Sequence, residues 1–177
     1  MSSSGHEREV REREVEAFCR VEHPRLVAAL TLYTGDVDLA AELAQEALAR
    51  AHGDWAKVGT MSSPGGWASR VAFNLANSHF RRQRYERAAR ERAASRLPAA
   101  PGTPADVGDP DVLRAVAALP QRQREAVALR FLLDLSVEDT AARMGCAAGT
   151  VRALTSQAVA RLRESPSLAD VKDPSCA

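Results

Sequence analysis

Arginine side chains are concentrated in two stretches of the chain, and both stretches have the composition to bind nucleic-acid phosphates. Residues 143–163 contain four Arg and no acidic residue, whereas residues 70–96 contain eight Arg and two Glu. Guanidinium groups neutralise phosphate charge, and a helix that displays them can lie in the major groove of a DNA duplex. Each stretch is also compatible with an ordinary amphipathic helix whose solvated face is basic.

The stretch 70–96 carries aromatic and amide side chains between its arginines. Aromatic rings stack on unpaired bases, so this mixture favours contact with a single strand. However, Val71, Leu75 and His79 follow the i, i+4, i+8 spacing of a buried stripe. Trp67 precedes the stretch and is more typical of a core position than of a base-stacking one. Taken alone, the stretch leaves both interpretations open.

The residues around position 145 predict two short helices joined by a tight turn. Ser136 is a favourable N-cap for a helix over 137–144, and Asp139 three residues later completes a weak form of the capping box. Gly145 stands where a left-handed residue must end that helix, and a second helix begins near Ala148 or Gly149. Two short helices joined by a Gly-containing turn form a helix-turn-helix motif.

The spacing of apolar residues supports this motif. Ala141 is small enough for the point at which the two helices cross, and Val151 and Leu154 pack back against the first helix. The second helix also offers polar and basic side chains, namely Arg152, Ser156, Gln157, Arg161 and Arg163. Because the N-terminal residues of such a helix contact base edges in the major groove, we predict DNA binding here.

Residues 36–54 have the opposite charge, with five acidic residues and one Arg. Leucines at helical spacing predict a helix over 38–52, which Asp36 or Asp38 can cap. An acidic amphipathic face is typical of a solvated helix. It also suits a protein partner, particularly on a chain that displays a basic helix elsewhere.

Helix signals recur along the whole chain, and no strand-like alternation of useful length is present. Alanine is abundant and aromatic residues make up only 5%, which favours helices over strands. Pro24 fits the first turn of a new helix, Gly35 fits a helix end, and Ser63 with Pro64 fits a helix start. The predicted helices cover 7–22, 24–34, 38–52, 64 to the low nineties, 111–119, 120–133, 137–144 and about 148–163.

Residues 97–110 differ in composition from the helical segments on either side. They contain four Pro and two Gly without any basic residue, which is typical of a flexible linker. We therefore predict an all-α protein of two small helical domains, 7–96 and 111–165, joined by this Pro-rich linker. The second domain contains the helix-turn-helix.

Several other classes of protein are disfavoured. The sequence has no Cys/His cluster with metal-ligand spacing, no Gly-rich phosphate loop and no nucleophile with a plausible base, so we predict no metal, no cofactor and no enzymatic activity. Cys19, Cys146 and Cys176 are expected to be reduced thiols. The N-terminus lacks a signal-peptide core, and no apolar run is long enough to span a membrane, so we expect a cytoplasmic protein without membrane insertion.

The order of these parts resembles a bacterial RNA polymerase sigma factor of the extracytoplasmic-function (ECF) class of the sigma-70 family. The resemblance spans about residues 18–164 and rests on three stretches in order. "TGDVDLAAELAQEALARAHGDW" is similar to the region that clamps the polymerase core. "SPGGWASRVAFNLANSHFRRQR" is similar to the region that melts and reads the downstream (minus-ten) promoter element. "LPQRQREAVALRFLLDLSVEDTAARMGCAAGTVRALTSQAVARLR" is similar to the region that binds the upstream (minus-thirty-five) element.

The resemblance implies three sets of site residues. Binding to the beta and beta-prime subunits of core polymerase is expected at Asp38, Leu39, Glu42, Leu43, Gln45 and Glu46. Binding to the downstream element is expected at Trp67, Arg70, Asn74, Asn77, Ser78, His79, Arg81 and Arg82. Binding to the upstream element is expected at Ala148, Gly149, Thr150, Arg152, Ala153, Ser156, Gln157 and Arg161.

Two positions depart from the family pattern. Many relatives have Asp where Ser78 stands, and the common run after Thr150–Val151 is Lys-Ser-Arg-Leu-Ser-Arg. Here residues 152–157 read Arg-Ala-Leu-Thr-Ser-Gln, so two basic residues of that run are missing. Contacts to the upstream element are therefore expected to differ in number or in sequence preference.

The resemblance implies a non-catalytic subunit that directs promoter-specific transcription initiation, while polymerase performs the chemistry. It also suggests an anti-sigma protein as a partner, and a location at the nucleoid when the chain is bound to polymerase. The residues leave two alternatives from other classes. One is a stand-alone helix-turn-helix transcriptional regulator, which would bind its duplex without polymerase, and the other is a helical adaptor without DNA contact.

Overall fold

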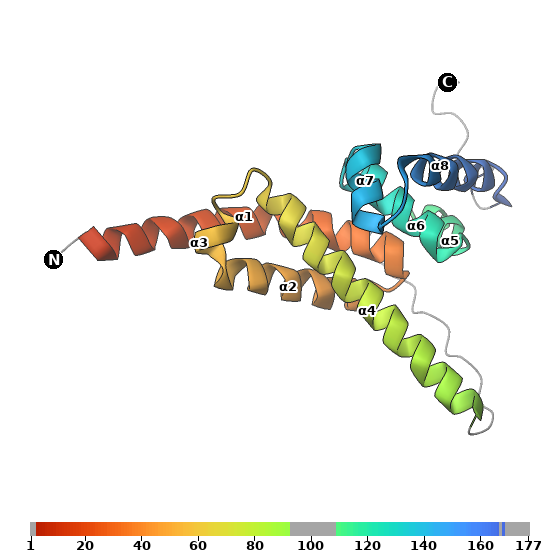
Figure 1. Cartoon of the computed structure of the whole chain (residues 1–177), viewed down its shortest axis with the longest axis horizontal. Helices are drawn as coiled ribbons and strands as arrows, with labels where there is room; N and C mark the ends of the chain where they lie inside the picture. Colours follow the sequence, from red (N-terminus) through yellow and green to blue (C-terminus); the bar gives the residue numbers. More distant parts are fainter. Residues whose placement is uncertain (1–2, 93–108, 167, 169–177) are drawn as a thin grey trace. The chain divides into compact units, whose positions relative to one another are not determined.

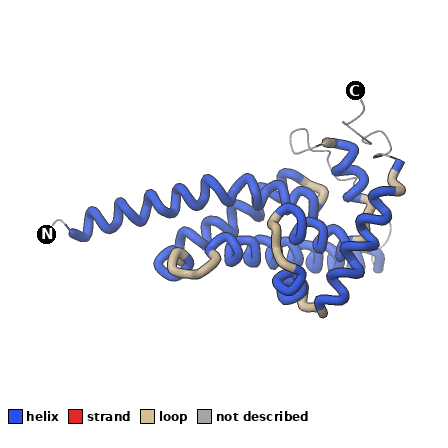
Figure 2. The backbone as a smooth tube through the Cα atoms, turned by 90° about the horizontal axis from the view of Figure 1, so that it is seen from above, coloured by secondary structure: helices blue, strands red, loops and turns tan. Residues whose placement is uncertain are grey.

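The structure is a computed structural model that describes residues 3–92, 109–166 and 168. Regular structure in these residues is entirely helical, as the tube in Figure 2 shows, and no strand occurs within them. This confirms the prediction of an all-α chain with a helix-turn-helix. Most of the predicted linker, 97–110, lies outside the described residues. None of the described helices is long and apolar enough to cross a bilayer.

The helices are labelled along the chain in Figure 1. Their bounds are α1 Ser3–Thr34, α2 Val37–Gly53, α3 Trp55–Val58, α4 Pro64–Arg92, α5 Pro110–Ala117, α6 Gln121–Val127, a π-helical turn η1 Ala128–Leu132, α7 Val137–Met144 and α8 Ala148–Arg163. The predicted helices 38–52, 64 to the low nineties, 137–144 and 148–163 correspond to α2, α4, α7 and α8, whereas α3 is a short helix that the sequence did not predict.

Local capping contacts explain why several helices begin and end where they do. Asp36 Oδ1 accepts the N–H of Leu39 at 3.0 Å, so Asp36 rather than Asp38 caps α2. Ser63 Oγ accepts the N–H of Gly66 at 3.1 Å at the start of α4. At the end of α1, Gly35 adopts a φ of 77°, a left-handed conformation that a side chain would make costly.

α1 continues through Pro24, so the predicted helix break at this residue is wrong. Proline has no N–H to donate to the carbonyl of Arg20 one turn earlier, and for that reason it normally interrupts a helix. Pro24 and Arg20 are both exposed, so water can reach the carbonyl that proline leaves unpaired. Val15 on one side of Pro24 and Leu26 and Leu30 on the other are all buried, and this burial favours the continuous helix.

The helix predicted over 120–133 forms, but it is not regular throughout. α6 follows Pro120, and the chain then widens into η1, where the N–H of Leu133 donates to the carbonyl of Ala128 at 3.2 Å. Leu129 is fully buried in this turn, whereas Phe131 is 59% exposed.

The described residues divide into two compact units. Unit 1 comprises the described parts of Met1–Val27 and Ala41–Ala99. One of its buried clusters contains Val15, Ala51, Trp55 and Val58, with Phe18, Cys19 and Trp67 packed against it. The rings of Phe18 and Trp55 lie 4.9 Å apart between centroids. Burial raises the pKa of the Cys19 thiol, which therefore stays protonated.

Unit 2 comprises Ala28–Ala40 and the described parts of Ala100–Ala177. A buried cluster of Val116, Leu119, Val127 and Ala158 joins α5, α6 and α8. Tyr33 is also fully buried in this unit, and Gln121 Nε2 donates a hydrogen bond to its hydroxyl oxygen at 3.0 Å. Burial, followed by the nearby Glu125 carboxylate, raises the pKa of Tyr33 to about 12, so the phenol stays protonated at neutral pH.

Candidate nucleic-acid interface

The turn between α7 and α8 has the geometry that the sequence predicts. Gly145 ends α7 with a φ of 62° and a ψ of 42°, and its N–H donates to the carbonyl of Ala141. The N–H of Cys146 donates to the same carbonyl at 3.0 Å. Because the left-handed conformation is easily reached only by glycine, Gly145 sets the angle at which α8 leaves α7.

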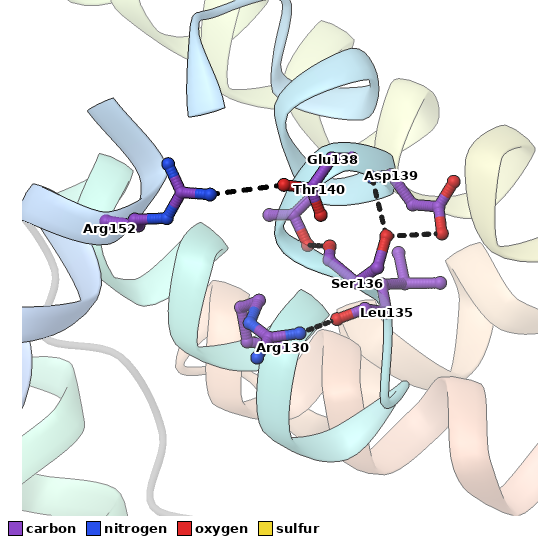
Figure 3. Close-up of polar contacts among 7 residues, drawn as sticks. All are labelled: Arg130, Leu135, Ser136, Glu138, Asp139, Thr140 and Arg152. Atoms are coloured by element: carbon purple, nitrogen blue, oxygen red, sulfur yellow. Dashed lines mark hydrogen bonds and ion pairs between the residues drawn. The ribbon is translucent and has the colours of Figure 1, made fainter. Parts of the chain in front are cut away.

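Polar contacts fix the first turn of α7, as Figure 3 shows. Ser136 Oγ accepts the N–H of Asp139 at 2.9 Å and donates to Asp139 Oδ2 at 2.6 Å. The hydroxyl of Thr140 donates to the carbonyl of Ser136 at 2.7 Å. Arg130 Nη1 donates to the carbonyl of Leu135, immediately before the cap. The start of α7 is therefore held both by its own cap and by η1.

The apolar contact between the two helices of the motif is buried. Ala141 is 6% exposed and Met144 is 7% exposed on α7, while Val151 on α8 is fully buried. Leu154 is half-buried one turn further along α8. Ala141, Val151 and Leu154 are the positions that the sequence assigns to this contact, and the structure adds Met144.

Side chains of α6 hold α8 along its length. Gln123 is only 4% exposed, and its Nε2 donates to Gln157 Oε1 at 3.1 Å. Arg161 Nη1 donates to the other end of the same amide, Gln123 Oε1, at 3.3 Å. A buried amide must have its hydrogen bonds satisfied, so Gln123 fixes the rotation of α8 about its own axis.

A second contact of α6 reaches the end of α7. Arg122 Nη2 donates to the carbonyl of Met144 at 3.1 Å, and Nη1 of the same guanidinium lies 3.0 Å from Glu125 Oε2. The Glu125 side chain is only 2% exposed. The carboxylate thus orients Arg122, and Arg122 satisfies one of the carbonyls left open at the end of α7.

Seven of the eight residues predicted for the upstream element are exposed on α8. These are Gly149, Thr150, Arg152, Ala153, Ser156, Gln157 and Arg161, while Ala148 is half-buried. Gly149, Arg152, Ala153 and Ser156 follow the i, i+3, i+4, i+7 spacing of one helix face. Gln157 and Arg161 differ from the others in that their exposed side chains are hydrogen-bonded to Gln123 on α6.

Glu138 on α7 faces the same surface and forms an ion pair with Arg152. Arg152 Nη2 lies 3.2 Å from Glu138 Oε1, and the two side chains are 63% and 69% exposed (Figure 3). The sequence analysis did not select Glu138. An acidic residue in the first turn of a helix is common for reasons of the helix dipole alone, so its sequence position carried no signal of this contact.

A second polar face runs along α4 in unit 1. Six of the residues predicted for the downstream element are exposed, namely Arg70, Asn74, Asn77, Ser78, Arg81 and Arg82. Their spacing places them on one side of the helix, while Phe73 and Ala76 are buried on the other. We call these six residues the α4 polar face. It combines amides with cationic groups, which suits a nucleic-acid strand.

Two predicted residues of α4 have different surroundings. Trp67 is half-buried against the Val15 cluster and therefore contributes to the core of unit 1. His79 is half-buried, and its ring lies 6.2 Å from that of Phe80 in an edge-to-face arrangement. Tyr85, which was not selected as a site residue, is 71% exposed one turn after Arg81. Tyr85 lies four residues after Arg81, so its helical spacing could have identified it as a further residue of this exposed side.

The residues of α2 that were predicted to bind core polymerase differ in their exposure to solvent. Asp38, Glu42, Gln45 and Glu46 are exposed at the i, i+4, i+7, i+8 spacing of one face, which we call the acidic face of α2. Leu43 is buried at 9% exposure, and Leu39 is half-buried. Glu46 Oε1 lies 2.8 Å from Arg50 Nε on the next turn. Among the described residues, no cluster of His, Cys, Asp or Glu is arranged to hold a metal ion.

Two protein-family models match separate parts of the chain. Residues 19–86 match the model for Sigma-70 region 2, and residues 111–162 match the model for Sigma-70, region 4. The matched segments contain α2, most of α4 and the whole helix-turn-helix.

Proteins that are similar to this chain over most of its length are named as RNA polymerase sigma factors. The RNA polymerase sigma-E factor of Streptomyces coelicolor is 30% identical over 154 residues, which cover 85% of this chain and 85% of that protein. The ECF RNA polymerase sigma factor EcfG of Rhodopseudomonas palustris is 34% identical over 140 residues, covering 78% and 77%. The sigma factor RpoE of Bartonella quintana, solved in complex with the anti-sigma factor NepR, superposes with a TM-score of 0.69 at 28% identity, covering 91% of this chain and 99% of that one.

The two family matches come in the expected order, and the two named relatives cover 85% and 78% of the chain. A stand-alone regulator would share the helix-turn-helix but not region 2. The chain therefore belongs to the ECF class of the sigma-70 family and is an RNA polymerase sigma factor.

Proposed function

We propose that α8 reads the upstream promoter element through its exposed face. The observation that carries this proposal is that Val151 is buried on one side of α8 while Arg152 and Ser156 are exposed on the other. Gln157 and Arg161 are exposed as well, but their side chains are hydrogen-bonded to Gln123 of α6. A recognition helix must be rigidly supported on one side and polar on the other. Arg152 and Ser156 are then the residues that meet base edges.

The α4 polar face is proposed to bind the opened strand at the downstream element. Arg70, Arg81 and Arg82 provide charge along the helix, and Asn74 and Asn77 provide amides between them. A strand without a partner exposes both its phosphates and its base edges, so this combination fits a melted promoter better than a duplex. Trp67 and His79 would support this face from beneath.

The acidic face of α2 is proposed to bind core polymerase, through its beta and beta-prime subunits. Leu43 and Leu39 would then serve mainly to anchor α2 in the protein, because they are buried or half-buried. On this proposal residues 7–96 act as one functional domain and residues 111–165 as another, with 97–110 between them.

Further properties follow from this role. The subunit needs no catalytic residue or cofactor of its own, because polymerase supplies the chemistry, and it acts in the cytoplasm at the nucleoid. The Bartonella quintana neighbour was solved with an anti-sigma factor. We propose that an anti-sigma protein also binds this chain.

Reversing the charge of Glu42 and Glu46 together to Lys should weaken binding to core polymerase by about tenfold or more, as expected when attraction becomes repulsion in an interface. Titration of labelled protein with core polymerase measures this. Arg50→Ala is the matched control, because it breaks the same Glu46–Arg50 pair without reversing the acidic face. Unchanged affinity in the double variant, with helical content retained, would remove this face from the interface.

The function as a whole is tested by run-off transcription with core polymerase on a library of promoter fragments. We expect specific transcripts only when both the chain and core polymerase are present. Binding of the chain alone to the same fragments should be weak and without sequence preference. Tight, selective binding without polymerase would instead favour action as an independent regulator.

A further inference from the structure

The carboxylates at the start of α7 have different partners. Asp139 accepts the hydroxyl of Ser136 at 2.6 Å, so its carboxylate belongs to the helix cap. Glu138, one residue earlier, points toward α8 and pairs with Arg152 at 3.2 Å (Figure 3). This contact joins residues 14 positions apart, and it is formed across the motif rather than within one helix.

Stability does not account for this pair. Both side chains are more than half exposed, and ion pairs of this kind contribute little to folding. The motif is already held by the buried Val151, by the cap at Ser136 and by Gln123. What the pair does is restrict one long side chain, that of Arg152, to a position near the N-terminus of α7.

Arg152 lies near the start of α8, the proposed recognition helix, so restricting its side chain affects how it can contact DNA. An arginine in the first turns of a recognition helix can form two hydrogen bonds with a guanine, or it can swing to a phosphate. The first geometry requires an oriented guanidinium, because its donors are arranged in a planar fork. The pair with Glu138 uses one N–H of Nη2. The second N–H of Nη2 remains to form a two-donor fork with its neighbour on Nη1 or Nε. The Glu138 carboxylate would also repel a phosphate that approached the same guanidinium.

We propose that Glu138 is a positioning residue for upstream promoter recognition: it holds Arg152 for contact with a base and disfavours its contact with phosphate. This inference rests on the proposed function of α8. Sequence discrimination would thus depend on an acidic side chain that lies on a different helix from the reader and lowers the general affinity for DNA.

Glu138→Gln tests this inference in the holoenzyme formed by the full chain and core polymerase. We expect its preference at one base pair of the upstream element to fall by about tenfold, as for loss of one base contact. Affinity for unrelated duplex should rise, and its salt dependence should become steeper by about one unit, because Arg152 gains a phosphate. Selection from a promoter library and titrations at several salt concentrations measure both quantities.

Glu164→Gln is the matched control, because it removes the same charge from an exposed residue at the C-terminal end of α8. It should raise affinity for all sequences slightly without changing preference. The double variant Glu138→Gln with Arg152→Ala should show no further loss of preference beyond Arg152→Ala alone. Thermal unfolding of Glu138→Gln should match that of the wild-type chain.

The outcomes separate this inference from the proposed function. If Glu138→Gln behaves like Glu164→Gln, Glu138 is only a solvated acid and the inference is overturned. The same conclusion follows if Glu138→Gln changes preference equally with and without Arg152. If the wild-type holoenzyme selects no upstream sequence at all, the proposed function of α8 fails, and the inference fails with it.

Discussion

Replacing Val151 with alanine is expected to lower the free energy of unfolding of the helix-turn-helix by about 2–3 kcal/mol, which is the usual effect of removing buried methyl groups without refilling the space. Val151 is fully buried where α8 packs against α7, and its neighbours Ala141 and Met144 are buried as well. The small side chain at 141 leaves little that could move into the cavity. Amide hydrogen exchange in α7 and α8 of the full chain measures this loss as a lower opening free energy.

The adjacent variant Arg152→Ala provides the matched control. Arg152 is exposed, and its pair with Glu138 contributes little to stability, so the opening free energy should stay within about 0.5 kcal/mol of wild type. Its effect should appear in DNA binding, as a loss of about 1–3 kcal/mol at one position of the upstream element. If instead Arg152→Ala unfolds the motif and Val151→Ala does not, the face of α8 assigned to DNA is the wrong one.

The double variant Asn74→Ala with Arg81→Ala is expected to reduce open-complex formation by about 30-fold, because two strand contacts at about 1 kcal/mol each are removed. Both residues are exposed on the α4 polar face, two turns apart. Initial recruitment to the promoter should change much less, since α8 would still bind duplex DNA. Permanganate footprinting reports unpaired thymines directly and separates these two steps.

Two further variants test the assignment of this face. Gln83 is exposed on a different side of α4, so Gln83→Ala should leave strand opening unchanged. Arg81→Lys keeps the charge but loses the planar guanidinium, and an intermediate effect would indicate hydrogen bonding beyond attraction to phosphate. Normal permanganate reactivity in the double variant at normal occupancy would show that the face is only a solvated surface.

Features that depend on neighbours in the sequence could be predicted. Ser136, Ser63 and Asp36 cap their helices through bonds to residues three positions ahead. Gly35 and Gly145 adopt left-handed conformations at helix ends. Such contacts are local, so the residue types and their spacing carry nearly all the information needed.

Pro24 shows where this local reasoning fails. The intrinsic preference of proline predicts a break, yet α1 is continuous because apolar residues on both sides of Pro24 are buried. η1 is a related case, since a π-helical turn has no distinct sequence signature. In both places packing overrides the local preference, and packing is not readable from a window of sequence.

The roles of individual site residues likewise depended both on local sequence and on packing against distant residues. The sequence identified the three helices that carry the candidate sites, because charge and spacing are visible in it. It also indicated a core position for Trp67, but it did not show that Gln157 and Arg161 bind Gln123. Those partners lie 34 and 38 residues away, and no helical periodicity connects them.

By itself, then, the sequence determined the helical class, most helix ends, the helix-turn-helix and the resemblance to ECF sigma factors, because each rests on bonds or spacings within a few residues. The spacing of Val151 and Leu154 also indicated which face of α8 packs on α7, whereas only the tertiary structure showed that Gln123 of α6 binds Gln157 and Arg161. The pairing of Glu138 with Arg152 was likewise decided only in three dimensions. An exposed carboxylate and an exposed guanidinium on different helices meet only when the angle between those helices is set, and that angle depends on Gly145 and the buried Val151.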